Sequence, residues 1–114
     1  MDIRPINPGH VLVIPNEHAA HLKDLEPTIG AHLFTIAQRI AISLQQGVVK
    51  AEGVNFFLAD GTAAGQEVPH IHLHVFPRFQ GDGFKLQFNP ASQKRPSRTT
   101  LDEMAQQLSH EMSR

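Results

Sequence analysis

The fold of this chain is decided by the stretch Pro69-His70-Ile71-His72-Leu73-His74-Val75-Phe76-Pro77. Three histidines alternate here with three aliphatic residues, and strict alternation of this kind predicts a β-strand, which we extend to about Phe79. In a strand the three imidazoles share one face, each about 6–7 Å from the next. The three aliphatic side chains then point to the opposite face, toward a core.

A strand face that carries three imidazoles is a poor core face, because each ring has polar nitrogens that need partners when they are buried. Two uses of such a face remain open. One is metal binding, in which a His-x-His pair supplies two ligands and His10 adds a third. The other is nucleophilic catalysis, in which a neutral imidazole attacks phosphorus while its neighbours stabilise charge and move protons. The spacing alone does not choose between them.

Composition narrows the class of protein. A chain of 114 residues has room for one domain with one core. Its 40% hydrophobic and 18% charged residues fit a globular protein, and a net charge of -1 predicts neither a nucleic-acid nor a membrane partner. There is no cysteine, which rules out disulfides and thiolate metal sites and is compatible with the cytoplasmic location that we expect. No apolar run approaches the roughly 20 residues of a membrane span.

Upstream of the histidines, the pattern predicts one strand and one long helix. Residues 10–14 are β-branched and aliphatic after His10, and we expect a buried, central strand there. Leu22 and Leu25 suggest a single helical turn. A helix is expected from Pro27 to about Gly47, because apolar residues recur at helical spacing: Ile29, Leu33, Ile36, Ala37, Ile40 and Leu44.

A further strand is expected over residues 54–59, followed by a glycine-containing loop over residues 60–66 that lets backbone amides approach a ligand. Residues 84–98 are expected to be mostly loop. Thr100 to Glu103 has capping-box spacing, which predicts the start of an amphipathic C-terminal helix. Because helices and strands do not alternate regularly, we expect an α+β fold with an antiparallel sheet, one long helix and a C-terminal helix.

The histidine stretch matches the His-φ-His-φ-His-φ-φ signature of the histidine triad (HIT) superfamily of nucleotide hydrolases and transferases, where φ is a hydrophobic residue. The segments 7–15 and 63–68 also resemble that family, and 77–84 resembles its prokaryotic branch. The resemblance is strongest over 2–84 and covers less of the loop and helix at 85–114. We expect a single HIT domain over 1–114, with fewer strands than the five-stranded sheet of the family.

The resemblance implies a catalytic role for four histidines. His72 is implied as the nucleophile that attacks the α-phosphorus of a nucleotide and forms a nucleotidyl-histidine intermediate. His74 is implied to contact phosphate oxygens and help the leaving group. His70 and His10 are implied to form a polar relay that orients the nucleophilic ring. The implied substrates are purine nucleotide derivatives, namely adenosine phosphoramidates or diadenosine polyphosphates.

The resemblance also implies a binding site. Asp2 is implied to bind the ribose hydroxyls and Ile3 to touch the nucleoside, while the amides around Gly65, Gln66 and Glu67 face the phosphate. No cofactor or metal is implied for this chemistry. Some prokaryotic relatives hold structural zinc through Cys-x-x-Cys and two histidines. His18 and His70 resemble the two histidines, but the cysteines are absent here, so we expect no metal site.

Members of the family begin well before the segment that corresponds to Asp2, with elements that help to wall the base pocket. We therefore expect an open nucleoside pocket, or one completed by a partner. The family implies a homodimer joined through the long helix and an adjacent strand. Alternatives to a hydrolase are a phosphorylase or transferase with the same intermediate, a non-catalytic nucleotide-binding module, and a metal-binding β protein that uses His10, His70, His72 and His74.

Overall fold

A computed structural model describes all 114 residues, Met1–Arg114, and they form two compact units, Met1–Phe84 and Lys85–Arg114. The first unit holds the three strands and the long helix, and the second holds the C-terminal helix. The expectation of a single HIT domain over 1–114 stays a prediction.

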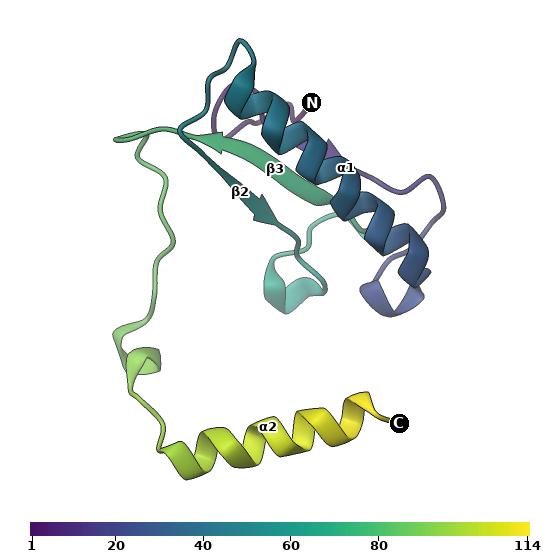
Figure 1. Ribbon diagram of the computed structural model, residues 1–114, viewed down its shortest axis with the longest axis vertical. Coiled ribbons are helices and arrows are strands. Elements are labelled where there is room, and N and C mark those ends of the chain that lie inside the picture. Colours follow the sequence, from purple (N-terminus) through teal and green to yellow (C-terminus); the bar gives the residue numbers. More distant parts are fainter. The chain divides into compact units, whose positions relative to one another are not determined.

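The first unit is built on a three-stranded antiparallel sheet in the order β1-β3-β2 (Figure 1). The strands are β1 (Val11–Val13), β2 (Gly53–Phe57) and β3 (Leu73–Arg78). The α+β class is confirmed. The prediction that the strand near His10 is central is wrong, because β1 pairs on one side only and β3 lies between the other two strands. β1 stops before Pro15, which has no N–H to donate to a ladder.

The predicted strand at the histidine stretch begins later than expected, at Leu73 rather than Pro69. Its partner β1 ends at Val13, which pairs with Leu73, so no ladder is available further upstream. The preceding residues are held by a loop instead, since the amide of Ile71 donates to the carbonyl of Ala19 at 2.7 Å. The alternation still holds, and the core-facing side chains are buried as predicted: Ile71, Leu73 and Val75.

Helix α1 (Pro27–Gln46) has Pro27 at its start and Gly47 at its C-cap, as predicted. It lies across one face of the sheet (Figure 1), and Leu33, Ala37 and Leu44 bury their side chains against β3. Because side chains alternate along a strand, His74 and Phe76 belong to the face that α1 does not cover. The predicted helical turn near Leu22 is also present, as a short 3₁₀ helix over Leu22–Asp24.

The second unit, Lys85–Arg114, contains a short 3₁₀ helix over Pro90–Gln93 and helix α2 (Arg98–Met112). The capping box predicted at Thr100 is wrong. Ser97 is the N-cap residue, and its hydroxyl accepts a hydrogen bond from the amide of Thr100 at 3.1 Å. The helix therefore begins at Arg98, before the predicted cap residue Thr100.

Neither helix of the chain combines the length and apolar character that crossing a membrane requires. The cytoplasmic location stays a prediction.

Candidate active site

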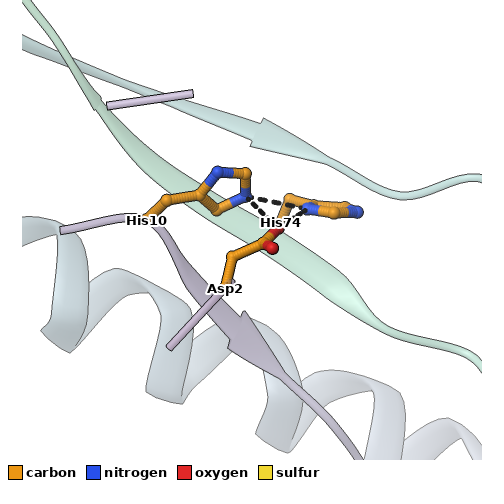
Figure 2. Close-up of side chains that lie close together, drawn as sticks. All are labelled: Asp2, His10 and His74. Atoms are coloured by element: carbon orange, nitrogen blue, oxygen red, sulfur yellow. Dashed lines mark hydrogen bonds and ion pairs between the residues drawn. The ribbon is translucent and has the colours of Figure 1, made fainter. Parts of the chain in front are cut away.

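His10 lies directly before β1 and is almost fully buried, with 2% of its surface exposed. Its ring packs against Phe76, with 5.0 Å between ring centroids. Both ring nitrogens are engaged. Nδ1 accepts a hydrogen bond from the amide of Ile6 at 3.0 Å, and Nε2 lies 2.9 Å from Nδ1 of His74 (Figure 2). The ring is therefore fixed by one backbone group and one side chain.

The carboxylate of Asp2 lies beside this histidine pair (Figure 2). Its Oδ2 is 3.4 Å from Nε2 of His10 and 3.8 Å from Nδ1 of His74. Its Oδ1 accepts the amide of Arg4 at 2.8 Å, and this hydrogen bond is the main reason that the pKa of Asp2 is lowered. Asp2 is thus an ionised neighbour of both rings.

His74 is the second residue of the central strand β3, opposite Leu12 of β1 and Phe57 of β2. Burial lowers the pKa of His74, and the nearby His10 and His72 lower it further, against the opposing effect of Asp2. Burial also lowers the pKa of His10. Both rings therefore favour the neutral form.

The other two triad histidines precede the ladder and bind backbone carbonyls. Nδ1 of His72 lies 2.7 Å from the carbonyl oxygen of His70, and Nε2 of His70 lies 3.0 Å from that of Pro15. A carbonyl can only accept, so each of these nitrogens carries the ring hydrogen. The neutral ring of His72 then keeps the lone pair on Nε2. The rings of His72 and His74 are 5.1 Å apart between centroids.

The predicted relay between His10 and His70 is not what the structure forms, since His10 pairs with His74 instead. His70 stacks on His18, with ring centroids 5.4 Å apart and Nδ1 atoms 3.4 Å apart. These are the two histidines that the resemblance assigns to zinc in some relatives. Two imidazoles supply only half of a tetrahedral set, and the chain has no cysteine to complete it. The residues present do not fit that zinc site.

Asp2, His10 and His74 also offer three ligand atoms within 4.8 Å of one another, which is close enough to hold one metal ion. A metal on Nε2 of a neutral His10 requires the ring hydrogen on Nδ1. That hydrogen would point at the amide hydrogen of Ile6, which already donates to Nδ1. The arrangement is thus suited to hydrogen bonding and not to coordination.

The loop before the triad is closed by Gln66. Its Oε1 accepts the amide of Gly61 at 2.7 Å, and its Nε2 donates to the carbonyl of Ala20 at 2.8 Å. Gly61 and Gly65 have φ of +96° and +93°, a conformation that glycine adopts at little cost. The side chain of Gln66 is therefore engaged in shaping the loop, and the predicted contact of its backbone amide with phosphate stays a prediction.

The remaining predicted binding residues are exposed. Glu67 is exposed in this loop, and Ile3 is 94% exposed near the N-terminus. The structure thus brings Asp2, His10, His72 and His74 together, whereas the ring of His70 contacts His18 and the carbonyl of Pro15. Sequence analysis missed the amide of Ile6 and the two hydrogen bonds of Gln66. Every residue except proline has a backbone amide, so the sequence does not show that the amide of Ile6 binds His10. Nor does a glutamine in the sequence show which backbone groups its side chain will bind.

Comparison with known proteins identifies the family. The sequence model described as "HIT domain" matches residues 1–81. The chain is 42% identical over 82 residues to a bis(5'-nucleosyl)-tetraphosphatase (asymmetrical) of Schizosaccharomyces pombe. The aligned region covers 72% of the chain and 44% of that protein. It is 38% identical to a bis(5'-adenosyl)-triphosphatase of Dictyostelium discoideum, over 72% of the chain and 54% of that protein. The chain thus spans about half the length of these curated relatives.

Solved structures agree with the sequence comparison. A Streptococcus mutans protein superimposes with a TM-score of 0.86 at 37% identity, over 98% of this chain and 69% of its own. A zinc-bound histidine triad family protein of Mycobacterium smegmatis gives a TM-score of 0.72 at 43% identity, over 79% of this chain and 65% of its own. With a family match over most of its length and a fold shared with these proteins, the chain belongs to the HIT family.

Proposed function

We propose that the protein is a nucleotide hydrolase that cleaves the α-phosphate linkage of purine nucleotidyl derivatives through a nucleotidyl-histidine intermediate. The observation that carries this proposal is the 2.7 Å contact between Nδ1 of His72 and the carbonyl of His70. This contact keeps the hydrogen on Nδ1 and the lone pair on Nε2, which is the form in which imidazole is a nucleophile. The names of two relatives, hydrolases of dinucleoside polyphosphates, support the reaction class.

In the proposed reaction, Nε2 of His72 attacks the α-phosphorus and the bond from phosphorus to the leaving group breaks. Water then attacks the phosphorus, the phosphorus–nitrogen bond breaks, and a nucleoside monophosphate and free His72 result. His74 donates a hydrogen bond to a phosphate oxygen. The amides of the loop at Gly65 to Glu67 face the same charge, which concentrates on the oxygens as the reaction proceeds.

The sugar and base are assigned to the N-terminal segment. The carboxylate of Asp2 binds the ribose hydroxyls, and the exposed side chain of Ile3 contacts the nucleoside. A carboxylate accepts two hydroxyl hydrogens well, and an exposed aliphatic side chain can cover one face of a base. His70 holds the backbone that orients His72. Adenosine phosphoramidates and diadenosine polyphosphates are the substrates to test first.

The test is turnover of both substrates by the wild-type chain, by His72→Ala and by His110→Ala. His110 is an exposed histidine in α2 and serves as the matched control. We expect His72→Ala to lose activity by a factor of about 10⁴ or more, as loss of a nucleophile does in other enzymes. After a quench in denaturant at alkaline pH, where a phosphorus–nitrogen bond survives, the wild-type peptide that contains His72 should carry one nucleoside monophosphate. Equal turnover by wild type and His72→Ala contradicts the proposal.

Phosphate in the assay separates a hydrolase from a phosphorylase, because a phosphorylase releases a nucleoside diphosphate instead of a monophosphate. Nucleotide binding without any turnover supports a non-catalytic binding module instead.

We also propose that the protein is a homodimer joined through α1 and β2. Both elements leave aromatic side chains exposed, and Phe34 of α1 meets Phe56 of β2 edge to face, with ring centroids 5.6 Å apart. β2 is also an edge strand with unpaired backbone groups. Sedimentation of Phe34→Glu against the exposed-site control Val48→Glu tests this. A monomer in the first variant and a dimer in the second is expected, whereas a monomeric wild type contradicts it.

A further inference from the structure

His72 lies just before the ladder of β3, so no strand partner holds it. β3 begins at Leu73, which pairs with Val13, the last residue of β1. The two residues before His72 are held instead by the segment 15–20, which supplies a carbonyl to each of them. The contacts of this segment therefore decide how the ring of His72 is oriented.

The peptide group between His70 and Ile71 transmits this hold to His72. Its N–H donates to the carbonyl of Ala19 at 2.7 Å, and its C=O accepts the hydrogen on Nδ1 of His72, also at 2.7 Å. A peptide group is planar, and in the trans form its N–H and C=O point in opposite directions. The bond to Ala19 therefore fixes the direction of the carbonyl that receives the hydrogen of His72.

His18, next to Ala19 in the chain, supports the ring of His70. The two rings lie 5.4 Å apart between centroids with 21° between their planes, and their Nδ1 atoms are 3.4 Å apart. Nε2 of His70 carries the ring hydrogen, because it faces the carbonyl of Pro15 at 3.0 Å. Nδ1 of a neutral His70 then presents a lone pair, so Nδ1 of His18 is the donor of the pair.

The backbone that carries His18 is itself anchored. Pro15 and Ala19 are buried, and Ala19 is only 2% exposed. The carbonyl of Ala20 accepts the side-chain amide of Gln66 at 2.8 Å. The exposed ring of His18 thus extends toward His70 from a fixed segment, which is what a rigid support requires.

We propose that His18 is a positioning residue for His72. The hydrogen on its Nδ1 holds the ring of His70, and the carbonyl of His70 in turn keeps the hydrogen of His72 on Nδ1 and the lone pair on Nε2. The inference rests on the proposed function, because the orientation of His72 affects catalysis only if that ring is the nucleophile. His18 acts through His70 and is assigned no contact with the substrate.

The kinetic effect should fall on the chemical step. Without the donor, His70 and its carbonyl can shift, and a small displacement of a reacting group is costly. We expect His18→Phe, which keeps a flat ring but loses the donor, to lower kcat by about 10- to 100-fold and to leave KM near the wild-type value. His18→Asn places an amide nitrogen where Nδ1 was and should restore kcat. His32→Asn alters an exposed histidine of α1 and is the matched control.

The decisive experiment is nitrogen-15 NMR of the histidine rings in the full chain without substrate, with a metal chelator present. At about pH 8 an ordinary imidazole is neutral, and the shifts of its two nitrogens report which one carries the hydrogen. We expect the hydrogen of His72 on Nδ1 and that of His70 on Nε2. In His18→Phe, the hydrogen of His72 should exchange between both nitrogens. His18→Asn and His32→Asn should keep the wild-type pattern.

The outcomes separate this inference from the proposed function. A changed His72 spectrum in His18→Phe, with a wild-type spectrum in His18→Asn, supports the role of His18 even if the wild-type chain turns over no substrate. In that case the proposed function alone fails. A wild-type His72 spectrum in His18→Phe, with or without a loss of kcat, overturns the inference. An equal change in His18→Phe and His18→Asn overturns the role of the donor. If His18→Phe does not fold, His18→Leu, which also lacks the donor, takes its place.

Discussion

Arg78 holds the carboxylate of Asp82 at two points, with 2.8 Å between Nε and Oδ2 and 2.9 Å between Nη2 and Oδ1. The carboxylate also accepts the amides of Phe79 and Phe84 and the side-chain amide of Asn7. A single carboxylate thus joins the end of β3 to the segment that carries His10. The hydrogen bonds from Arg78, followed by those from the backbone, hold the pKa of Asp82 well below its usual range.

We predict that Asp82→Asn lowers the melting temperature at neutral pH, because the amide that replaces one carboxylate oxygen points a donor at Arg78 or at a backbone N–H. The folded pKa of Asp82 is below the unfolded value, so its contribution to stability is present above about pH 4 and fades as the pH falls below it. The melting temperatures of wild type and Asp82→Asn should therefore converge in acid.

Asp102→Asn is the matched control for this prediction. It removes an exposed ion pair with Arg98 in α2, and exposed pairs contribute about 0–1 kcal/mol. Its melting temperature should stay near that of the wild type at each pH. An equal loss in both variants would mean that the Asp82 contacts add little.

A second prediction concerns the stability of the fold and the glycine at the end of α1, Gly47. A Cβ added there would lie 2.6 Å from the carbonyl oxygen of Ser43, which is backbone and cannot rotate away. Gly47→Ala should therefore destabilise the fold by about 1–3 kcal/mol, as overpacking does. Gly81→Ala provides a comparison, because a Cβ there meets no atom within 4 Å and the cost comes only from its positive φ. Chemical denaturation measures both, and an unchanged midpoint for Gly47→Ala refutes the prediction.

Gln66→Ala should loosen the loop before the triad. It removes the acceptor for the amide of Gly61 and the donor to the carbonyl of Ala20. Both hydrogen bonds are partly buried, so each unmet group costs about 1 kcal/mol, the lower end of the range for buried groups. Hydrogen exchange of the Gly61 amide should accelerate. Gln66→Glu should keep the Gly61 amide protected, because a glutamate still accepts its hydrogen bond. The same variant loses the hydrogen bond to Ala20, because a carboxylate oxygen cannot donate to a carbonyl. Equal exchange in wild type and Gln66→Ala would show that the side chain does not close the loop.

The lowered pKa values of His10 and His74 predict acid sensitivity above the range in which carboxylates titrate. Both rings are neutral in the fold and bind a proton on unfolding below about pH 6.5, so stability falls as the pH drops from there. The slope is at most about 1.4 kcal/mol per pH unit for each ring. Denaturation midpoints of the wild type between about pH 7 and 5 measure it.

His10→Asn should be less stable at neutral pH but should show a flatter decline in acid. His110→Gln alters an exposed ring and should follow the wild-type slope. Parallel curves for wild type and His10→Asn would contradict this origin of the decline.

The sequence predicts the parts of this fold that depend on local pattern. The burial of Ile71, Leu73 and Val75 follows from alternation, and the ends of α1 follow from Pro27 and Gly47. The order of the strands does not follow, because a run of aliphatic residues at 10–14 looks the same at an edge as in the centre. The start of β3 depends on where its partner stops, which is a property of β1 and not of the histidine stretch.

The candidate site divides in the same way. The alternating histidines identify the chemistry, and the family signature identifies their order. The partner of His10 is 64 residues away, and the choice between His70 and His74 depends on the pairing of β1 with β3. At the C-terminal helix, Ser97 and Thr100 both satisfy the pattern of a cap. The structure selects Ser97, whose hydroxyl meets an amide three residues later.

The central position of β3 also determines which backbone hydrogen bonds open first. β3 has a partner on each side, and Val75, next to His74, is fully buried beneath α1. Strands of this kind open only with the whole domain, whereas the exposed loop at 61–66 opens locally. The ring of His74, which is proposed to bind phosphate, thus belongs to the strand that opens most slowly. The backbone amides proposed to face the same phosphate belong to a loop that opens quickly. Thermal motion will disturb the loop long before it disturbs His74.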